Sequence, residues 1–375
     1  MAGIYIHIPF CKQACHYCNF YFSVSPSLKS DLTKAIVKEI ELSKDYLDGE
    51  VIETIYFGGG TPSLLTDDEI KSILDAIYHF HPKINLQELT LEANPDDLTQ
   101  EKINELLSLR PYGLNRLSIG VQSFHEADLI YMNRAHSAEE ASSAIKRAQD
   151  SGFDNLTIDL IYGTPGMNDD QWIENIQSAI GLDIPHISSY ALTVEPKTYL
   201  DKHIKSGKAR PVDEAQTVRQ FDILMNRMAE QKYDQYEISN FAKPGHYAIH
   251  NTNYWLGKKY LGLGPSAHSY DSHSRRWNVA NNLNYIKGIN DSVIPAEIEI
   301  LNPTQQANEL IMTSLRTIWG LNLDRLKSES HKSQILESLK NIDPLFYIFD
   351  NSVLKLTQKG KHYADRIASD LFIEE

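Results

Sequence analysis

Cysteine is scarce in this chain, which has three cysteines among 375 residues. Cys11, Cys15 and Cys18 lie within one eight-residue stretch. An odd number of cysteines at such short spacings cannot cross-link distant parts of a large domain through disulfide bonds. A disulfide-rich scaffold is therefore excluded, and we interpret the three thiols as ligands.

Long apolar runs and an excess of positive charge are also missing. No stretch approaches the roughly 18 consecutive apolar residues of a membrane span, and the N-terminus lacks the basic and apolar regions of a secretory signal. Lys and Arg number 36 against 50 Asp and Glu, a net charge of −14, which disfavours a broad grip on nucleic acid or anionic membranes. We expect a cytoplasmic protein with no membrane anchor and no nucleic-acid partner.

The remaining composition, 42% apolar and 23% charged, is that of an ordinary globular protein. The length predicts one large domain with a smaller partner. Short β-rich runs recur along the first part of the chain, each followed by a segment with helical periodicity. The six predicted strands are residues 4–10, 54–57, 88–92, 116–122, 156–162 and 187–192.

Helices predicted between these strands begin in several cases with Ser, Thr or Asp caps. Strands alternating with helices indicate a parallel sheet, so we predict an α/β fold, an incomplete (β/α)6 barrel resembling part of a TIM barrel. The predicted helices are residues 28–47, 66–80, 99–109, 137–151 and 169–181.

Three parts of the chain are predicted: a barrel over residues 1–234, an irregular connecting segment over 235–302, and a helical, winged-helix-like domain over 303–375. In this last part we expect helices at 307–318, 323–328, 333–342 and 360–371, and a hairpin pairing 346–349 with 353–356. It holds 9 basic and 10 acidic residues, which disfavours DNA binding by the winged domain.

Unusual residues follow the predicted strands, where the chemistry of such barrels is found. The cysteines follow the first strand, and the sequence Gly-Gly-Gly-Thr-Pro at 58–62 follows the second. Glu92 ends the third strand, Gln122 ends the fourth and Asp159 lies in the fifth. We expect these side chains to gather on one rim.

The spacing Cys11-x3-Cys15-x2-Cys18 places three thiolates on one loop, where they can converge on three corners of an iron–sulfur cube and leave the fourth iron open. Two alternatives stay open: a zinc knuckle with His16 as the fourth ligand, or buried thiols without a ligand. The glycine motif exposes backbone N–H and C=O groups that suit the polar end of a small ligand. It lacks the spacing of dinucleotide and triphosphate loops.

The cysteine spacing with Tyr17, followed by the Gly-Gly-Gly-Thr-Pro loop, resembles the radical S-adenosylmethionine (SAM) superfamily. The wider pattern, including Tyr5-Ile6-His7-Ile8-Pro9-Phe10-Cys11, Gly120-Val121-Gln122-Ser123 and Asp159-Leu160-Ile161-Tyr162-Gly163, is similar to the oxygen-independent coproporphyrinogen III oxidase family over nearly the whole chain. This resemblance implies a [4Fe-4S] cluster on the cysteines, with SAM chelated to the open iron. The SAM-site residues it implies are Tyr5, Tyr17, Gly59, Gly60, Thr61, Glu92, Gln122, Arg134 and Asp159.

The motif His250-Asn251-Thr252-Asn253-Tyr254-Trp255 resembles the H-N-x-x-Y-W signature of the HemW branch, whose members are regarded as haem chaperones. The resemblance implies haem as a further cofactor, with His250 as the candidate axial ligand, because an imidazole can bind haem iron. His246, His268 and His273 are rival ligands. C-type attachment of haem is excluded because no cysteine lies beyond the cluster motif.

Two departures separate this sequence from the oxidase. Phe20 stands where the oxidase has a further cysteine, and the oxidase has a longer extension before its first strand. The expected function is therefore haem binding and transfer to an acceptor protein, with an electron donor for the cluster and a possible homodimer. Oxidative decarboxylation of coproporphyrinogen III is the alternative.

Overall fold

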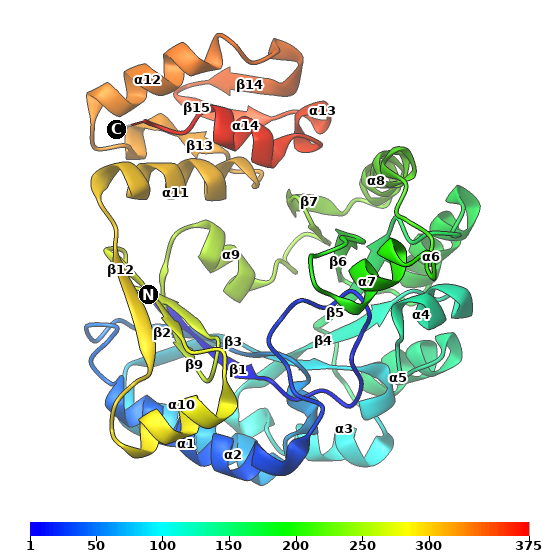
Figure 1. Ribbon diagram of the computed structural model, residues 1–375, viewed down its shortest axis with the longest axis vertical. Helices are drawn as coiled ribbons and strands as arrows, with labels where there is room; N and C mark the ends of the chain where they lie inside the picture. Colours follow the sequence, from blue (N-terminus) through cyan, green and yellow to red (C-terminus); the bar gives the residue numbers. More distant parts are fainter. Residues whose placement is uncertain (375) are drawn as a thin grey trace.

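The computed structural model describes residues 1–374. Its centre is a curved sheet in which six parallel strands follow one another in chain order, as predicted. The sheet ends in two edges and does not close on itself, so the barrel is incomplete (Figure 1). The strands are β1 (Ala2–Ile8), β2 (Ile52–Gly59), β3 (Ile84–Ala93), β4 (Leu114–Gln122), β5 (Leu156–Tyr162) and β6 (His186–Ala191).

Helices cover the outer face of this sheet (Figure 1). Three of them begin with a capping box, at Thr66, Ser137 and Asn168. In each box the side chain of the cap residue accepts from the backbone N–H of the third helical residue, whose side chain accepts from the backbone N–H of the cap residue. The helices Glu126–Met132, Tyr199–Lys205 and Glu214–Glu230 have no counterpart among the predicted ones. The helices of this part are α1 (Lys29–Leu42), α2 (Asp67–Phe80), α3 (Gln100–Leu107), α4 (Glu126–Met132), α5 (Ala138–Asp150), α6 (Asp169–Gly181), α7 (Tyr199–Lys205) and α8 (Glu214–Glu230).

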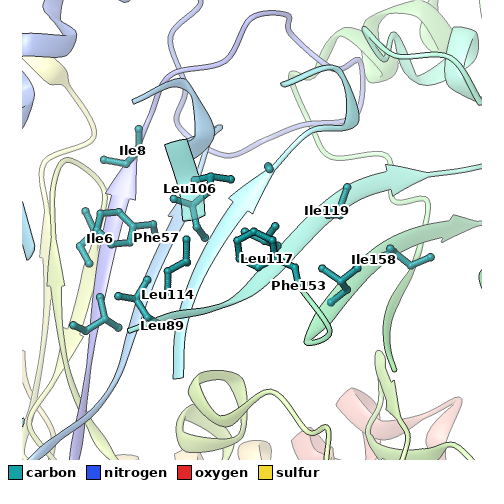
Figure 2. Packing of buried hydrophobic residues seen from close by; sticks show 14 of the residues in the cluster. Ile6, Ile8, Phe57, Leu89, Leu106, Leu114, Leu117, Ile119, Phe153 and Ile158 are labelled. Carbon is teal, nitrogen blue, oxygen red and sulfur yellow. The ribbon is translucent and has the colours of Figure 1, made fainter. Parts of the chain in front are cut away.

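Apolar and polar side chains alternate along the parallel strands. Figure 2 shows Ile6, Phe57, Leu89 and Leu117 packed with Leu106 of α3 in the main hydrophobic core. The alternate positions line the inner face instead, because successive side chains of a strand point to opposite faces. These inner positions are mainly polar and include Tyr5, Tyr56, Thr90, Glu92, Arg116, Ser118, Thr157 and Asp159.

Residues 235–302, expected to be irregular, contain regular elements that extend the sheet at both edges. Their strands have only three to five residues, which is too short for a hydrophobic period to reveal them. Strand β9 pairs in parallel with β1, while β8 pairs antiparallel with β6. The elements are β7 (Asp234–Glu237), β8 (Asn240–Ala242), α9 (Ile249–Trp255), β9 (Lys259–Leu263), β10 (His268–Tyr270), β11 (Ser274–Asn278), α10 (Asn282–Asn290) and β12 (Ala296–Ile300).

The C-terminal part has its own hydrophobic core. The predicted hairpin is present, but 323–328 holds only a 3-10 turn at Leu323–Arg325, and the last predicted helix is divided in two. No helix among residues 1–374 is long and apolar enough to cross a membrane. The elements are α11 (Pro303–Leu315), β13 (Leu321–Asn322), α12 (Glu329–Leu339), β14 (Tyr347–Asp350), β15 (Val353–Leu356), α13 (Gln358–Lys361) and α14 (Ala364–Asp370).

Candidate functional site

The loop of residues 9–25 carries the three cysteines, and backbone hydrogen bonds join its two ends. Phe10 forms a bridge with Ser23. The Cys11 N–H donates to the Ser23 carbonyl at 3.0 Å, and the Ser23 N–H donates to the Pro9 carbonyl at 2.6 Å. The thiols are thereby presented at the C-terminal end of β1.

Helix α4 anchors the middle of the same loop. The helix ends at Asn133, whose φ of +56° is left-handed, a conformation that Asn tolerates better than most residues. The Asn133 side chain donates to the Ala14 carbonyl at 2.8 Å, and the His16 N–H donates to the Met132 carbonyl at 3.1 Å. Asn133 is not among the residues predicted from the sequence, although an Asn at a helix end is a recognised termination signal.

A pocket of about 490 Å³ lies at the C-terminal rim of the sheet, and we call it the cysteine pocket. The structure brings together here every residue that the sequence placed at the cluster or at SAM. They come from the ends of β1 to β5 and from the loops that follow, as a parallel sheet requires. They are Tyr5, Cys11, Cys15, Tyr17, Cys18, Gly59, Gly60, Thr61, Glu92, Gln122, Arg134 and Asp159.

The glycine loop packs tightly against the cysteine loop. A Cβ on Gly60 would lie 2.7 Å from the Phe10 carbonyl oxygen and 2.8 Å from that of Ile8. The Gly60 N–H already donates to the Ile8 carbonyl at 2.8 Å, and the Gly59 N–H donates to Glu92 Oε2 at 3.0 Å. Both N–H groups are therefore engaged within the protein, while Gly59 and Gly60 still line the cysteine pocket. At Gly60 a glycine is needed because the two loops approach closely.

Glu92 lies between the glycine loop and Tyr56, an aromatic residue that is not among the predicted site residues. The Tyr56 hydroxyl donates to Glu92 Oε1 at 2.6 Å, and the opposite oxygen receives the Gly59 N–H. Burial raises the pKa of Glu92, and the two hydrogen bonds lower it by a smaller amount. The Tyr5 ring stacks on Tyr56 with centroids 6.1 Å apart, and its hydroxyl lies 3.0 Å from His7 Nδ1.

Arg134 connects the ends of β3 and β4 to the cysteine loop. Its Nη2 donates to Asn94 Oδ1 and to the Gly120 carbonyl, both at 2.7 Å, while Nη1 lies 3.2 Å from Cys15 Sγ. Asn94 in turn donates to Thr61 Oγ1 at 3.1 Å. Arg134 Nε is buried and has no partner among the described residues, so a carboxylate in the pocket could accept from it.

The cysteine environment fits an iron–sulfur cluster. Burial raises the pKa of Cys11 to about 11. A hydrogen bond with Thr61 lowers this pKa, whereas the two neighbouring thiols raise it. Burial also raises the pKa of Cys18. Bound iron would offset the cost of three thiolates so close together, because thiolates are the usual ligands of such clusters.

The zinc alternative lacks its fourth ligand. His16 Nδ1 is 3.0 Å from the Tyr131 carbonyl, and its ring stacks on Tyr199 with centroids 4.3 Å apart. Within residues 1–374, no three His, Cys, Asp or Glu side chains are grouped closely enough to hold a single metal ion. A cluster is a different case, because each thiolate binds a separate iron.

Asp159 and Gln122 complete the wall of the cysteine pocket. Burial raises the pKa of Asp159 to about 7, and the nearby Glu92 adds to the rise while Arg134 opposes it. Gln122 is buried at an irregular point of β4 and has a φ of +68°. A left-handed backbone in a residue other than glycine costs of order 1 kcal/mol and is frequent at functional sites.

His250 does not line the cysteine pocket but an inner cavity of about 230 Å³ within the barrel, which shares Glu92 and Asp159 with that pocket. Its ring is buried, with Nδ1 2.7 Å from Thr54 Oγ1 and Nε2 2.8 Å from the Tyr254 hydroxyl. Glu88 accepts from the backbone N–H groups of Ile249 and His250 and so holds the start of α9. Burial lowers the pKa of His250 to about 3.

The H-N-x-x-Y-W motif is thereby divided between two places. His250 and Asn251 line the inner cavity, whereas Trp255 lines a different groove and Tyr254 contributes to both. Both ring nitrogens of His250 are engaged, so iron could bind there only if one of these hydrogen bonds broke. Of the rival histidines, His246 is half-buried, and His268 and His273 are exposed.

Comparisons with known proteins agree with this geometry. The family model described as the radical SAM superfamily matches residues 5–179. A Bacillus subtilis protein named "Heme chaperone HemW" is 35% identical over 96% of this chain and 92% of its own length. A Mycobacterium tuberculosis protein with the same name is 31% identical, over 98% and 94%. In zebrafish, "Radical S-adenosyl methionine domain-containing protein 1, mitochondrial" is 29% identical, over 100% and 87%.

Among solved structures, coproporphyrinogen III oxidase (HemN) from Escherichia coli superimposes with a TM-score of 0.84. The match covers 99% of this chain and 90% of that one, at 20% sequence identity. At this identity the likeness establishes the fold alone, which confirms the predicted incomplete barrel.

Proposed function

The chain belongs to the HemW family of the radical SAM superfamily, and from this premise we propose that it is a haem chaperone. It binds a [4Fe-4S] cluster, SAM and haem, and passes the haem to an acceptor protein. The observation that carries this proposal is the convergence of three cysteines and nine further predicted residues on one pocket, in a chain similar to haem chaperones over its whole length.

The residues of the cysteine pocket have separate roles toward the cofactors. Cys11, Cys15 and Cys18 hold three irons of the cluster. Arg134 Nε donates to the SAM carboxylate, and Asp159 accepts from a ribose hydroxyl when it is ionised, above a pKa of about 7. When bound, the cluster supplies the electron that a sulfonium needs for reductive cleavage. The irregular backbone at Gln122 directs its side chain into the pocket.

The second candidate function is oxidative decarboxylation of coproporphyrinogen III, which the fold shared with HemN favours. The electrostatics oppose it, because this substrate is a tetracarboxylate. The inner cavity beside the cysteine pocket is lined by the carboxylates of Glu92 and Asp159. Its buried Arg116 already donates to Asn155 and Thr157, at 2.6 and 2.5 Å. An anionic substrate would find little compensation there, and a cavity of about 230 Å³ is also below the range of small-molecule sites.

Phe20 also separates the two functions. It lines the mouth of the cysteine pocket and is 70% exposed, where the resembling oxidase has a further cysteine. The proposal includes an electron donor that reduces the cluster, a haem-requiring acceptor and a cytoplasmic location. A homodimer would be compatible with all of these.

Anaerobic reconstitution with iron and sulfide, followed by parallel assays, tests the proposal. We expect one haem bound per chain, transfer of that haem to apomyoglobin as a general acceptor, and no conversion of coproporphyrinogen III with SAM and a reductant. Turnover of the porphyrinogen would instead favour the oxidase. A colourless protein that carries zinc would contradict the cluster assignment.

A further inference from the structure

A second large cavity lies apart from the cysteine pocket. It has a volume of about 430 Å³ and is bounded by the end of α9, strands β9 to β11, α11 and the start of α12. It shares no lining residue with the cysteine pocket. Small-molecule sites occupy roughly 300–1,000 Å³, so this cavity is large enough for an organic ligand, whereas the inner cavity is not.

We call this cavity the aromatic groove. One of its walls consists of Tyr254, Trp255, Tyr260 and Tyr270. The rings of Tyr254 and Tyr260 meet edge to face with centroids 4.5 Å apart, and those of Tyr260 and Tyr270 lie 6.2 Å apart. Leu310 and Met312 of α11 also line the groove. Such a wall suits a flat, largely apolar ring system.

The groove also carries positive charge that the protein does not neutralise. Arg275 is paired with Glu309. Arg325, by contrast, donates only to the Leu256 carbonyl at 3.3 Å, and Lys327 has no ion pair among residues 1–374. Both side chains are exposed and line the groove of a chain whose net charge is −14. Two free cations beside an aromatic wall fit a ring system that bears two carboxylates.

His331 supplies a metal ligand at the same place. It lies in the first turn of α12, lines the groove and is half-buried. Its backbone N–H donates to Ser328 Oγ, but its ring has no hydrogen bond among the described residues. His250 is the opposite case, since both of its ring nitrogens are engaged inside the barrel.

We infer that haem binds in the aromatic groove, with its iron on His331, its propionates at Arg325 and Lys327, and its ring against Tyr260 and Trp255. This inference rests on the proposed function and assigns its haem site. His250 acts here only as a positioning residue, because its Nε2 holds the hydroxyl of Tyr254, which lines the groove.

Haem and metal-free protoporphyrin IX, titrated separately into the reconstituted protein, distinguish these roles. We expect His331→Ala to weaken haem binding at least tenfold and to abolish the absorption shift of an axial nitrogen ligand. Its affinity for protoporphyrin IX should change less than twofold, because that molecule has no iron. Arg325→Ala combined with Lys327→Ala should weaken both ligands at least tenfold, because both carry the propionates.

His250→Ala and the exposed His79→Ala serve as comparisons. Because His250 acts through Tyr254, its variant should weaken haem and protoporphyrin IX equally, and His79→Ala should change neither. The inference is overturned if His331→Ala leaves haem binding and its spectrum intact while His250→Ala removes them. If the unaltered protein binds no haem at all, the proposed function itself fails, which is a separate result.

Discussion

The cysteine pocket and the aromatic groove are built in different ways. The pocket gathers residues from Tyr5 to Asp159 at the ends of consecutive parallel strands. The groove forms where the extended sheet meets α11 and α12, which pack around a separate hydrophobic core. The geometry of the pocket therefore follows from the βα repeat, whereas that of the groove depends on how the C-terminal part docks.

The C-terminal part docks on both sides of the opening of the barrel. On one side, the Arg316 guanidinium lies over the Trp255 ring at 5.3 Å. On the other side, His362 lies 2.8 Å from Asp222 of α8, and Lys361 donates to Gln235 at 2.8 Å. Figure 1 shows this part across the opening, with α11 facing α9 and α13 beside α8. The two regions can therefore be perturbed separately, and four experiments compare them.

The largest effect is expected from replacing Cys11, Cys15 and Cys18 together by Ala. Bound iron should fall to background because all three thiolate ligands are lost, while haem affinity should stay within about twofold of the original, because the groove shares no residue with the pocket. Iron and sulfide analysis with a haem titration measures both. Asn19→Ala, on the same loop, should retain its iron. Loss of haem binding together with the cluster would show that the two regions are not independent.

Gly60→Ala should destabilise the protein and lower its iron content. The new methyl group would lie 2.7 Å from a backbone oxygen that no side-chain rotation can move, at a cost of about 3 kcal/mol. Gly181→Ala is the matched control, because nothing lies within 4 Å of its Cβ position. Urea unfolding measures both variants. Equal stability of the two would contradict the tight packing of glycine and cysteine loops.

His250→Gln tests the buried imidazole through its pH dependence. The pKa of His250 is lowered by burial to about 3, so below pH about 6.5 the unfolded chain takes up a proton that the folded chain does not. The stability that His250 contributes is present at pH 7 and is lost as the pH falls. Relative to His250→Gln, the unfolding free energy should drop by about 2 kcal/mol between pH 7 and pH 5.

The control for this pH series is His79→Gln, at an exposed histidine of α2. A pH-independent difference between the unaltered protein and His250→Gln would place His250 in contact with solvent. In that case the His250 imidazole would be free to bind iron, and haem would not be confined to the aromatic groove.

The smallest effect is expected from Arg134→Lys, which keeps the charge and loses the planar fork that joins Asn94, Gly120 and Cys15. SAM should bind about tenfold more weakly, equivalent to about 1.4 kcal/mol, while iron content is retained. Equilibrium dialysis with labelled SAM measures this affinity. The exposed Arg219→Lys should leave it unchanged, and an unchanged affinity in Arg134→Lys would remove Arg134 from the SAM site.

Much of the cysteine pocket could be predicted from the sequence because a parallel βα repeat fixes where strand ends meet. Glu92 and Asp159 lie on the inward side of β3 and β5, so strand alternation places them together once the sheet is known. The supports of the pocket were harder to predict. The seven-residue helix α4 is too short to show a clear period, and Asn94 acts through contacts with Arg134 and Thr61 that only the fold creates.

The aromatic groove could not be predicted in the same way. Strand β10 has three residues and pairs with β9 and β11, so its hydrophobic pattern carries almost no information. His331 belongs to no motif and gains its role only where α12 approaches β9 to β11. The division of the H-N-x-x-Y-W motif also follows from α9 entering the barrel, which a linear signature does not show.

One chain is proposed to hold SAM and haem in separate places. Haem titration of the reconstituted protein, with and without saturating SAM, tests it most directly. We expect one haem per chain with the same affinity in both titrations. Displacement of haem by SAM, or a haem affinity that falls in proportion to SAM concentration, would instead place both ligands in the cysteine pocket.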